Sequence, residues 1–334
     1  MRSESLYGLT LGVLILAVVL MAYTTEDKES DSLMVLRASL GEEIPDHYME
    51  NPSEAEIRTG YQLIHEGKAD RNGSKSQYIS RFYTCVSCHN TVREDPDLTK
   101  VDQEARLQYA VETGIPYLQG STFWGIVNRT VWYNDDYVKK YGELVVEANK
   151  SLQASIQLCA QECSQGREVE EWEMQAILAY LSTLEVKVAN LGLSEAESEL
   201  LNRSSLANED KLKLLDSKFL DRSPATFSEL PSDKQAGYPF EGRTDIGRHI
   251  YEISCQYCHK EDGVSDLVLD NSRKTFKWLK KNIKKDMRYS LYEIIRKGTY
   301  AEYGHREYMP HYTLEKMSHQ QVEDLRAYIE QQAD

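Results

Sequence analysis

The chain has 334 residues, of which 41% are hydrophobic and 28% charged, a balance typical of a folded protein that faces water. Its formal net charge of −15 argues against nucleic acid as a partner, because the phosphates would be repelled. The length is sufficient for two domains of ordinary size together with an anchor and linkers.

The first residues predict a membrane anchor. Leu6 to Tyr23 carry no charge, follow Arg2 and precede an acidic run at 26–31. Such a stretch reaches the lower limit of the roughly 17–25 residues that cross a bilayer, and the arginine favours a cytoplasmic N-terminus. A cleaved signal peptide is the alternative, but no small-residue cleavage site closes the stretch. We expect residues 1–25 to anchor the protein at the periplasmic face of the inner membrane, followed by a polar stalk at 26–52.

A helix is expected to begin after the stalk. Ser53 and Glu56 have the spacing of a capping box, in which each side chain satisfies the backbone of the other. Ile57, Tyr61 and Ile64 then recur at helical spacing.

A pentapeptide motif occurs twice further along, as Cys85-Val86-Ser87-Cys88-His89 and as Cys255-Gln256-Tyr257-Cys258-His259. C-x-x-C-H attaches c-type haem: both thiols add across the vinyl groups at one porphyrin edge, and the histidine binds the iron. C-x-x-C alone could be half a zinc site or a redox dithiol, but zinc needs a second pair nearby and a dithiol does not need the histidine. The sequence therefore predicts two covalently bound haem c groups, attached at Cys85, Cys88, Cys255 and Cys258, with iron ligands His89 and His259.

Between the two motifs the pattern predicts several helices. Gln103–Thr113, Ser151–Cys163 and Val169–Leu184 carry apolar residues at helical spacing. Ser121 to Tyr141 is dense in aromatic residues, which usually line a core or cover a haem face, and Arg129 is embedded among them. The last of these helices is expected to close a first haem domain.

The predicted fold is all-α, with two class I cytochrome c domains in tandem behind an N-terminal transmembrane helix. The first domain covers residues 53–186. A connector at 187–240 contains a charged helix over Ser194–Leu215. The second domain covers 241–334 and repeats the first in a shorter form, beginning with a helix over Thr244–Ile253.

The second haem needs another iron ligand, and Met309 is the best candidate. Pro310 follows it, so the methionine lies on a stiffened loop before the last helix and can present its thioether to iron. Met287 falls on an apolar helical stripe and Met317 abuts the closing helix. The remaining candidates, expected to be exposed, are His305, His311 and His319.

The first domain has no equivalent methionine. Met174 lies within the predicted closing helix, where core packing explains it better. Cys159 and Cys163 remain, either with Cys159 as a thiolate ligand or with the two as a disulfide. In a regular helix, Cβ atoms four residues apart are about 5–6 Å from each other, whereas a disulfide needs about 3.8 Å. A disulfide therefore requires the helix to be broken, and the alternatives stay open.

The pattern around Cys159 consists of Ser151, Leu152, Ile156, Cys159 and Gly166, followed by Glu173, Met174, Ala176, Ala179 and Tyr180. It resembles the first domain of dihaem thiosulfate dehydrogenases and is similar to the haem subunits of the periplasmic sulfur-oxidation pathway. The resemblance implies that Cys159 binds the first haem iron and that His259 and Met309 bind the second. In those families an arginine four residues before the cysteine contributes to the anion site, and here that position is Ser155. Cys163 replaces a small hydroxyl-bearing residue of the family motif.

Two function classes follow from these patterns. One is a carrier that moves electrons from the first haem to the second and on to a redox partner, a cytochrome or a respiratory complex. The basic run Arg273–Arg288 is the expected docking surface, unless it is only a solvated helix face. The other is a thiosulfate dehydrogenase-like oxidoreductase on a small sulfur anion, with Cys159 catalytic and Arg129 or Arg167 supplying positive charge.

Overall fold

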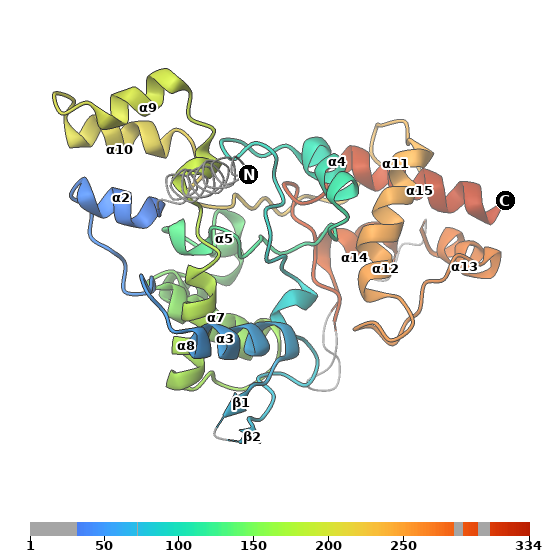
Figure 1. Ribbon diagram of the computed structural model, residues 1–334. Coiled ribbons are helices and arrows are strands. Elements are labelled where there is room, and N and C mark those ends of the chain that lie inside the picture. Colours follow the sequence, from blue (N-terminus) through green and yellow to red (C-terminus); the bar gives the residue numbers. More distant parts are fainter. Residues whose placement is uncertain (1–31, 72, 284–289, 300–307) are drawn as a thin grey trace, which may run out of the picture. The chain divides into compact units, whose positions relative to one another are not determined.

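The computed structural model describes residues 32–71, 73–283, 290–299 and 308–334 (Figure 1). The predicted anchor, Met287, His305 and the end of the basic run lie outside these residues. Within them, no helix combines the length and the apolar character that a membrane crossing requires. The described chain is mostly helical, which confirms the predicted all-α class. It falls into two compact units.

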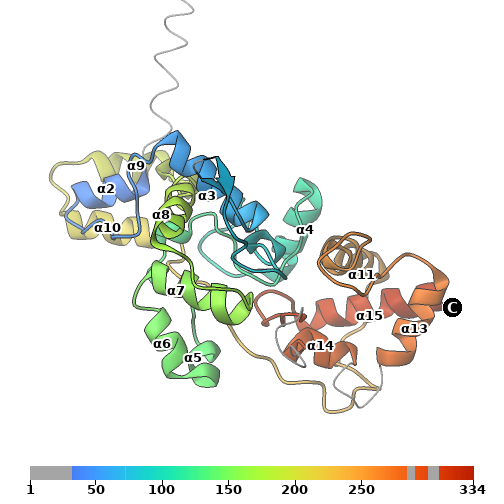
Figure 2. The ribbon, with the colours of Figure 1, turned by 90° about the horizontal axis from the view of Figure 1, so that it is seen from below.

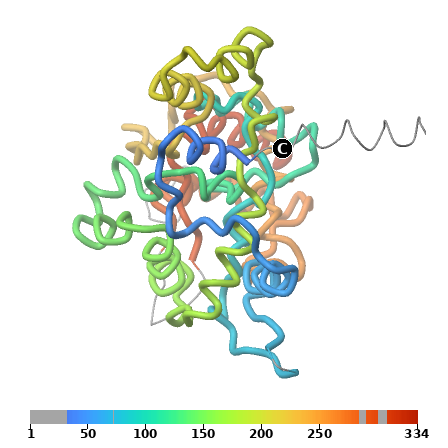
Figure 3. The backbone as a smooth tube through the Cα atoms, turned by 60° about the vertical axis from the view of Figure 1, so that its left-hand side comes forward, coloured from blue at the N-terminus to red at the C-terminus, as the bar shows by residue number. Residues whose placement is uncertain are grey.

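The smaller unit contains the described residues up to Ile44 together with Val186–Lys218. Its helices are α2 (Leu33–Ser39), the 3₁₀ turn η4 (Val188–Leu191), α9 (Glu195–Asn202) and α10 (Asn208–Asp216). Figure 3 shows α2, in blue, beside the yellow pair α9 and α10.

Part of the segment predicted as a polar stalk is therefore a packed helix. Ser32 caps α2 by accepting a hydrogen bond from the Val35 N–H, and Leu33 and Met34 are buried. The Arg37 guanidinium contacts Asp216 at 2.7 Å, which ties α2 to α10. The helix predicted over Ser194–Leu215 divides into α9 and α10, because the backbone is extended at Arg203.

The larger unit contains Pro45–Glu185 and Phe219–Asp334. Its first pair of helices is α3 (Glu54–Glu66) and α8 (Glu171–Ser182), whose crossing is visible in Figures 1 and 2. The predicted capping box at Ser53 is formed. Gly60 sets the crossing, because a Cβ there would lie 1.9 Å from the Ala176 carbonyl oxygen and 2.8 Å from the Tyr180 Cβ.

A second pair, α11 (Thr244–Ile250) and α15 (His319–Ala333), repeats this crossing. A Cβ at Gly247 would lie 1.9 Å from the Asp324 carbonyl oxygen and 2.8 Å from the Tyr328 Cβ. Ser318 and Gln321 form a capping box at the start of α15. Only glycine lets the backbones of such helices approach so closely.

The other elements of the larger unit are short. They are β1 (Asp70–Arg71) and β2 (Ser74–Lys75), which pair antiparallel, η1 (Cys85–Ser87), α4 (Gln103–Thr113), η2 (Ile126–Asn128), α5 (Asp136–Tyr141), α6 (Glu143–Ala148), α7 (Leu152–Leu158), the π-helical turns η3 (Cys159–Cys163) and η5 (Tyr251–Cys255), α12 (Gln256–Cys258), α13 (Arg273–Ile283) and α14 (Leu291–Lys297).

Two core clusters fill this unit. One contains buried residues of α3 and α8, among them Leu63 and Ile177. The other contains residues of α11 and α15 together with Leu107 and Ala110 of α4. A helix that precedes the second motif by more than a hundred positions therefore packs into the core around that motif.

Candidate haem-attachment site

The first C-x-x-C-H motif forms a tight turn that fixes the orientation of its histidine. The backbone N–H of His89 donates to the Cys85 carbonyl at 3.1 Å. Its ring Nδ1–H donates to the Ser121 carbonyl at 2.6 Å, and Phe123 stacks on the ring at 4.5 Å between centroids. A carbonyl can only accept, so the hydrogen bond fixes the tautomer and leaves Nε2 free as a metal ligand.

The second motif repeats this geometry. The His259 backbone N–H donates to the Cys255 carbonyl at 3.0 Å, and its Nδ1–H donates to the Leu267 carbonyl at 2.9 Å. Burial lowers the pKa of His89 and His259 alike, which favours the neutral imidazole that iron ligation requires.

The thiols of both motifs lie in apolar surroundings. Burial raises the pKa of Cys85 and Cys258 to about 11 and that of Cys88 and Cys255 to about 12. Cys85 packs against the core cluster of α3 and α8, and Cys255 packs against the cluster of α11 and α15. Each pair of thiols is thus presented, uncharged, beside an apolar core, as a porphyrin edge requires.

The two motifs are in direct contact. The Tyr257 hydroxyl donates to the Val86 carbonyl at 2.9 Å, and the Cys258 sulfur lies 3.9 Å from the Ser87 carbonyl oxygen. The sequence contained no signal for this contact, because the motifs are far apart along the chain. The structure places the two attachment segments side by side.

Met309 lies on a loop whose backbone is fixed at several points. Its N–H donates to the Thr299 hydroxyl at 2.7 Å, and its carbonyl accepts from the Thr299 N–H at 2.9 Å. The Tyr83 hydroxyl, just ahead of the first motif, donates to the Tyr308 carbonyl at 2.8 Å. The Met309 side chain packs against the same core cluster as Cys255, which places it in the surroundings of the second motif. Its role as ligand stays a prediction.

The other candidate ligands of the second domain that the structure describes lie in packed surroundings, and the Nε2 atom of His311 is buried without a partner among the described residues. Met317 is 1% exposed, within the core. The expectation that His311 and His319 are exposed is wrong, because both are partly buried by aromatic neighbours. His319 stacks on Tyr238 at 3.9 Å, and His311 meets Phe227 edge-on at 4.6 Å.

Cys159 and Cys163 are both free thiols and occupy the π-helical turn that follows α7. The Ser164 N–H donates to the Cys159 carbonyl at 2.8 Å, a bond that spans five residues instead of four. The contact between the two thiols is the main cause that raises the pKa of Cys159 and lowers that of Cys163. Cys85 and Cys88 are close enough to add to the effect on Cys159. Met174 is 6% exposed, in the core as predicted.

Arg296 of α14 offers a test of whether the second region suits a haem. Its side chain is 3% exposed, and Nη1 donates to the Met317 carbonyl at 2.8 Å. Nε and Nη2 are buried and have no partner among the described residues. A buried guanidinium with unsatisfied donors needs an anion, and the carboxylates that a haem carries are suitable acceptors. The residues present therefore fit the group.

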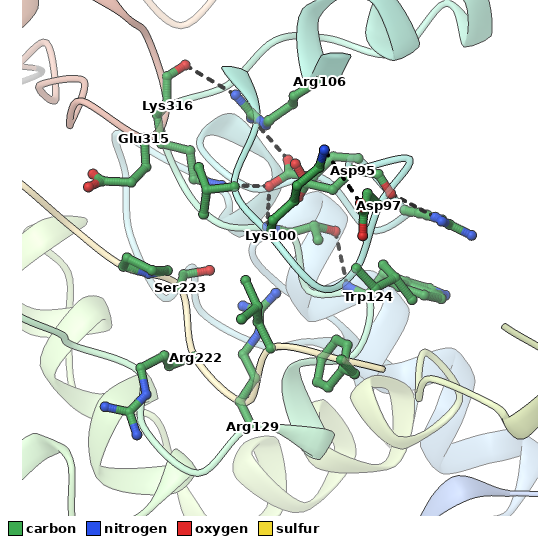
Figure 4. A pocket seen from close by; sticks show the side chains of 18 residues that line it. Asp95, Asp97, Lys100, Arg106, Trp124, Arg129, Arg222, Ser223, Glu315 and Lys316 are labelled. Carbon is green, nitrogen blue, oxygen red and sulfur yellow. Dashed lines mark hydrogen bonds and ion pairs between the residues drawn. The ribbon is translucent and has the colours of Figure 1, made fainter. Parts of the chain in front are cut away.

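A buried ion cluster that the sequence did not reveal lies near His89 and lines a cavity of about 60 Å³ (Figure 4). Glu94 contacts Arg106 at 3.1 Å and Lys316 at 2.7 Å, and the three residues are 2%, 2% and 8% exposed. Burial alone would raise the pKa of Glu94, but the two cations outweigh it and hold that pKa well below its ordinary value. Charged residues that are scattered along a sequence usually lie at the surface, so no local pattern identified these three as buried.

The two arginines considered for an anion site differ in their surroundings. Arg167 forms a two-pronged pair with Glu173, with distances of 2.7 and 2.6 Å, so its charge is already satisfied. The guanidinium of Arg129 points into the cavity beside the ion cluster (Figure 4). Burial lowers the pKa of Arg129.

Helix α13 carries the described part of the basic run. Phe276 and Ile283 are buried on its inner side, while Lys274, Lys277 and Lys281 are exposed. Trp278 is 49% exposed, an unusual value for a large aromatic side chain. The outer face of α13 therefore combines several cations with an accessible aromatic ring.

Comparison with known proteins concerns the second motif region. A family described as "Cytochrome C oxidase, cbb3-type, subunit III" matches residues 242–329. No curated protein and no solved structure matches the chain. The matched region contains the second C-x-x-C-H motif, Met309, α11 and most of α15, so the motif and the fixed orientation of its histidine are consistent with the family. Residues 242–329 therefore form a cytochrome c domain, which implies covalently bound haem c, supports a c-type cytochrome and suggests an extracytoplasmic or membrane-associated location.

Proposed function

We propose that the protein is a dihaem electron carrier, held at the periplasmic face of the inner membrane by residues 1–25. The first haem is attached at Cys85 and Cys88 with His89 as ligand. The second is attached at Cys255 and Cys258, with His259 and Met309 as ligands.

A repeated arrangement carries this proposal. The family-matched region contains a glycine-mediated helix crossing at Gly247 and a C-x-x-C-H turn whose histidine donates Nδ1–H to a backbone carbonyl. The region before it contains the same crossing at Gly60 and the same donation from His89. Two segments that share this combination of helix packing, attachment motif and histidine orientation are expected to bind the same cofactor.

When bound, each haem supplies one iron centre that accepts or gives up one electron. The chain contributes the attachment thiols, fixes the histidine tautomers and excludes water with its two core clusters. The contact of Tyr257 with Val86 brings the two attachment segments together, which favours exchange of electrons within one molecule.

The haem count tests the proposal. Intact mass and the optical spectrum of the chemically denatured protein should both give two haems per chain. Replacing Cys85 and Cys88 by alanine should leave one haem, and replacing Cys255 and Cys258 should leave the other. A single haem in the unaltered protein, insensitive to the first pair of substitutions, would refute the dihaem proposal.

We propose the outer face of α13 as the docking surface for an acidic redox partner. The chain as a whole carries a formal charge of −15, so a local face with Lys274, Lys277 and Lys281 stands out from its surroundings. Such a face speeds encounter with an acidic protein and makes the rate depend on salt. Lys277→Glu should slow electron transfer to an acidic acceptor protein at low salt, with little change for a small neutral acceptor.

A sulfur-anion oxidoreductase is the second candidate, and the position of Cys159 beside Cys85 and Cys88 favours it. In that case thiosulfate or sulfite should reduce the protein in stopped-flow spectra, and Cys159→Ala should abolish this reduction while both haems stay attached. Unchanged reduction by a small artificial donor is the control. If no sulfur anion reduces the protein, only the carrier remains.

A further inference from the structure

Cys159 and Cys163 lie at the two ends of a π-helical turn, so their separation is not the one that a regular α-helix imposes on residues four positions apart. Helix α7 ends at Leu158, and the Gly166 N–H donates to the Ala160 carbonyl at 2.8 Å just beyond the turn. A Cβ at Gly166 would lie 2.2 Å from the Ile79 carbonyl oxygen, so this end of the turn is tightly packed. The backbone thus holds the wide turn in place, and the two thiols in it lie close enough for each to shift the pKa of the other.

Aromatic side chains lie beside the two thiols, which are close to the first motif. The Tyr133 hydroxyl donates to the Ser155 carbonyl at 3.5 Å and lies close enough to Cys163 to lower its pKa, and the Tyr137 ring meets the Tyr133 ring edge-on at 5.6 Å. Both cysteines are partly buried. Cys85 and Cys88 lie close enough to Cys159 to raise its pKa further.

We propose that Cys159 and Cys163 form a redox-active dithiol beside the first haem motif, which closes to an intramolecular disulfide. Closure forms one S–S bond, breaks two S–H bonds, and releases two protons to solvent and two electrons. With both haems bound, two ferric irons would supply the two oxidising equivalents that this closure needs. The destination of the electrons rests on the proposed function, whereas the dithiol rests only on the geometry of the turn.

The pairing gives Cys159 two mutually exclusive states. As a thiol or thiolate its sulfur is available to iron, and as half of a disulfide it is not. Because the sulfur couple moves two electrons and a haem moves one, a chain with two haems can take up both electrons without releasing a radical. Cys163 is thus the residue that sets the state of Cys159.

Thiol counting on the intact holoprotein tests the proposal. The protein is reduced with an excess of dithiol, freed of reductant without oxygen, and given two equivalents of a one-electron ferric oxidant. After an anaerobic wait it is unfolded with a maleimide and digested. The peptide that contains Cys159 and Cys163 should lose both labels together and be lighter by two hydrogen atoms, while the haems return to the ferrous state.

One variant removes a cysteine of the pair, and a second variant beside the pair serves as its control. Cys163→Ser should keep one label on Cys159 and leave the haems ferric, and Ser164→Ala, next to the pair, should behave as the unaltered protein. Retention of both labels in the unaltered protein after oxidation would overturn the dithiol. Disulfide formation together with labels on Cys85 and Cys88 would support the dithiol and refute the dihaem function, because those thiols would then be free of haem.

Discussion

The Tyr257 hydroxyl donates a hydrogen bond of 2.9 Å to the Val86 carbonyl, so the middle residues of the two C-x-x-C-H motifs touch. Each residue lies between the two cysteines of its own motif, which places this bond at the junction of the attachment segments. The tyrosine side chain is long enough to reach the other motif, and its hydroxyl makes the hydrogen bond.

Tyr257→Phe should remove this bond and keep the ring. We expect a loss of about 1 kcal/mol in the free energy of unfolding, the ordinary value for one hydrogen bond. Denaturant unfolding measures it, with Tyr61→Phe as a control because that ring is 45% exposed. The rate of electron redistribution after partial reduction should fall in Tyr257→Phe, and equal rates in both variants would show that the contact has no role in it.

Gly60→Ala and Gly247→Ala should each destabilise the larger unit. The added Cβ would lie 1.9 Å from the Ala176 or the Asp324 carbonyl oxygen, so the helices must separate. Overpacking of this kind costs about 1–3 kcal/mol. Thermal unfolding measures the loss, and Thr59→Ala, one position from Gly60, is the control. Equal stability of Gly60→Ala and Thr59→Ala would contradict the close crossing.

Glu94→Gln should leave two buried cations without their counter-ion and cost about 3–5 kcal/mol at neutral pH. The sign of the pH dependence follows from the pKa of Glu94, which is lower in the folded than in the unfolded chain. As the pH falls below about 4.3, the unfolded chain takes up the proton first and stability decreases.

Unfolding midpoints measured from pH 7 down to pH 3 check this expectation. The variant should start lower and decline less steeply in acid than the unaltered protein. Glu147→Gln, which breaks an exposed pair with Lys150, should follow the unaltered curve. If both glutamine variants behave alike, the buried cluster does not contribute as described.

Met309→Ala should remove the weak far-red absorption band that a methionine–iron bond gives in the ferric spectrum, while the haem stays attached through Cys255 and Cys258. Met317→Leu is the matched control, because Met317 is buried in the core and a swap of similar volume is well tolerated. Persistence of the band in Met309→Ala would exclude Met309 as the ligand.

Local features of the fold were predictable from the sequence. The helix predicted at Gln103–Thr113 has those bounds in the structure, because Asp102 caps its start and Gly114 ends it with a left-handed backbone. The capping boxes at Ser53 and Ser318 are formed for the same reason. Such capping signals involve residues only three or four positions apart, so they can be recognised directly in the sequence.

Other features depend on contacts that no local pattern encodes. The sequence predicts a regular helix through Cys159, whereas the structure has a π-helical turn there. A backbone hydrogen bond that spans five residues cannot be recognised from the spacing of apolar residues. The packing of α2 depends on Val186–Lys218, far along the chain. The two attachment motifs could be recognised in the sequence, but the contact between them could not be predicted from it.

The pair formed by Glu94 and Lys316 joins residues 222 positions apart, one within the family-matched region and one well before it. Substitution of Glu94 alone would leave Lys316 as an unmatched charge in the interior, whereas substitution of Lys316 would leave Glu94 paired with Arg106 only. A change at either position therefore weakens a contact that holds the family-matched region to the region before it. The cytochrome c domain of this protein is thus tied through its interior to the region that precedes it.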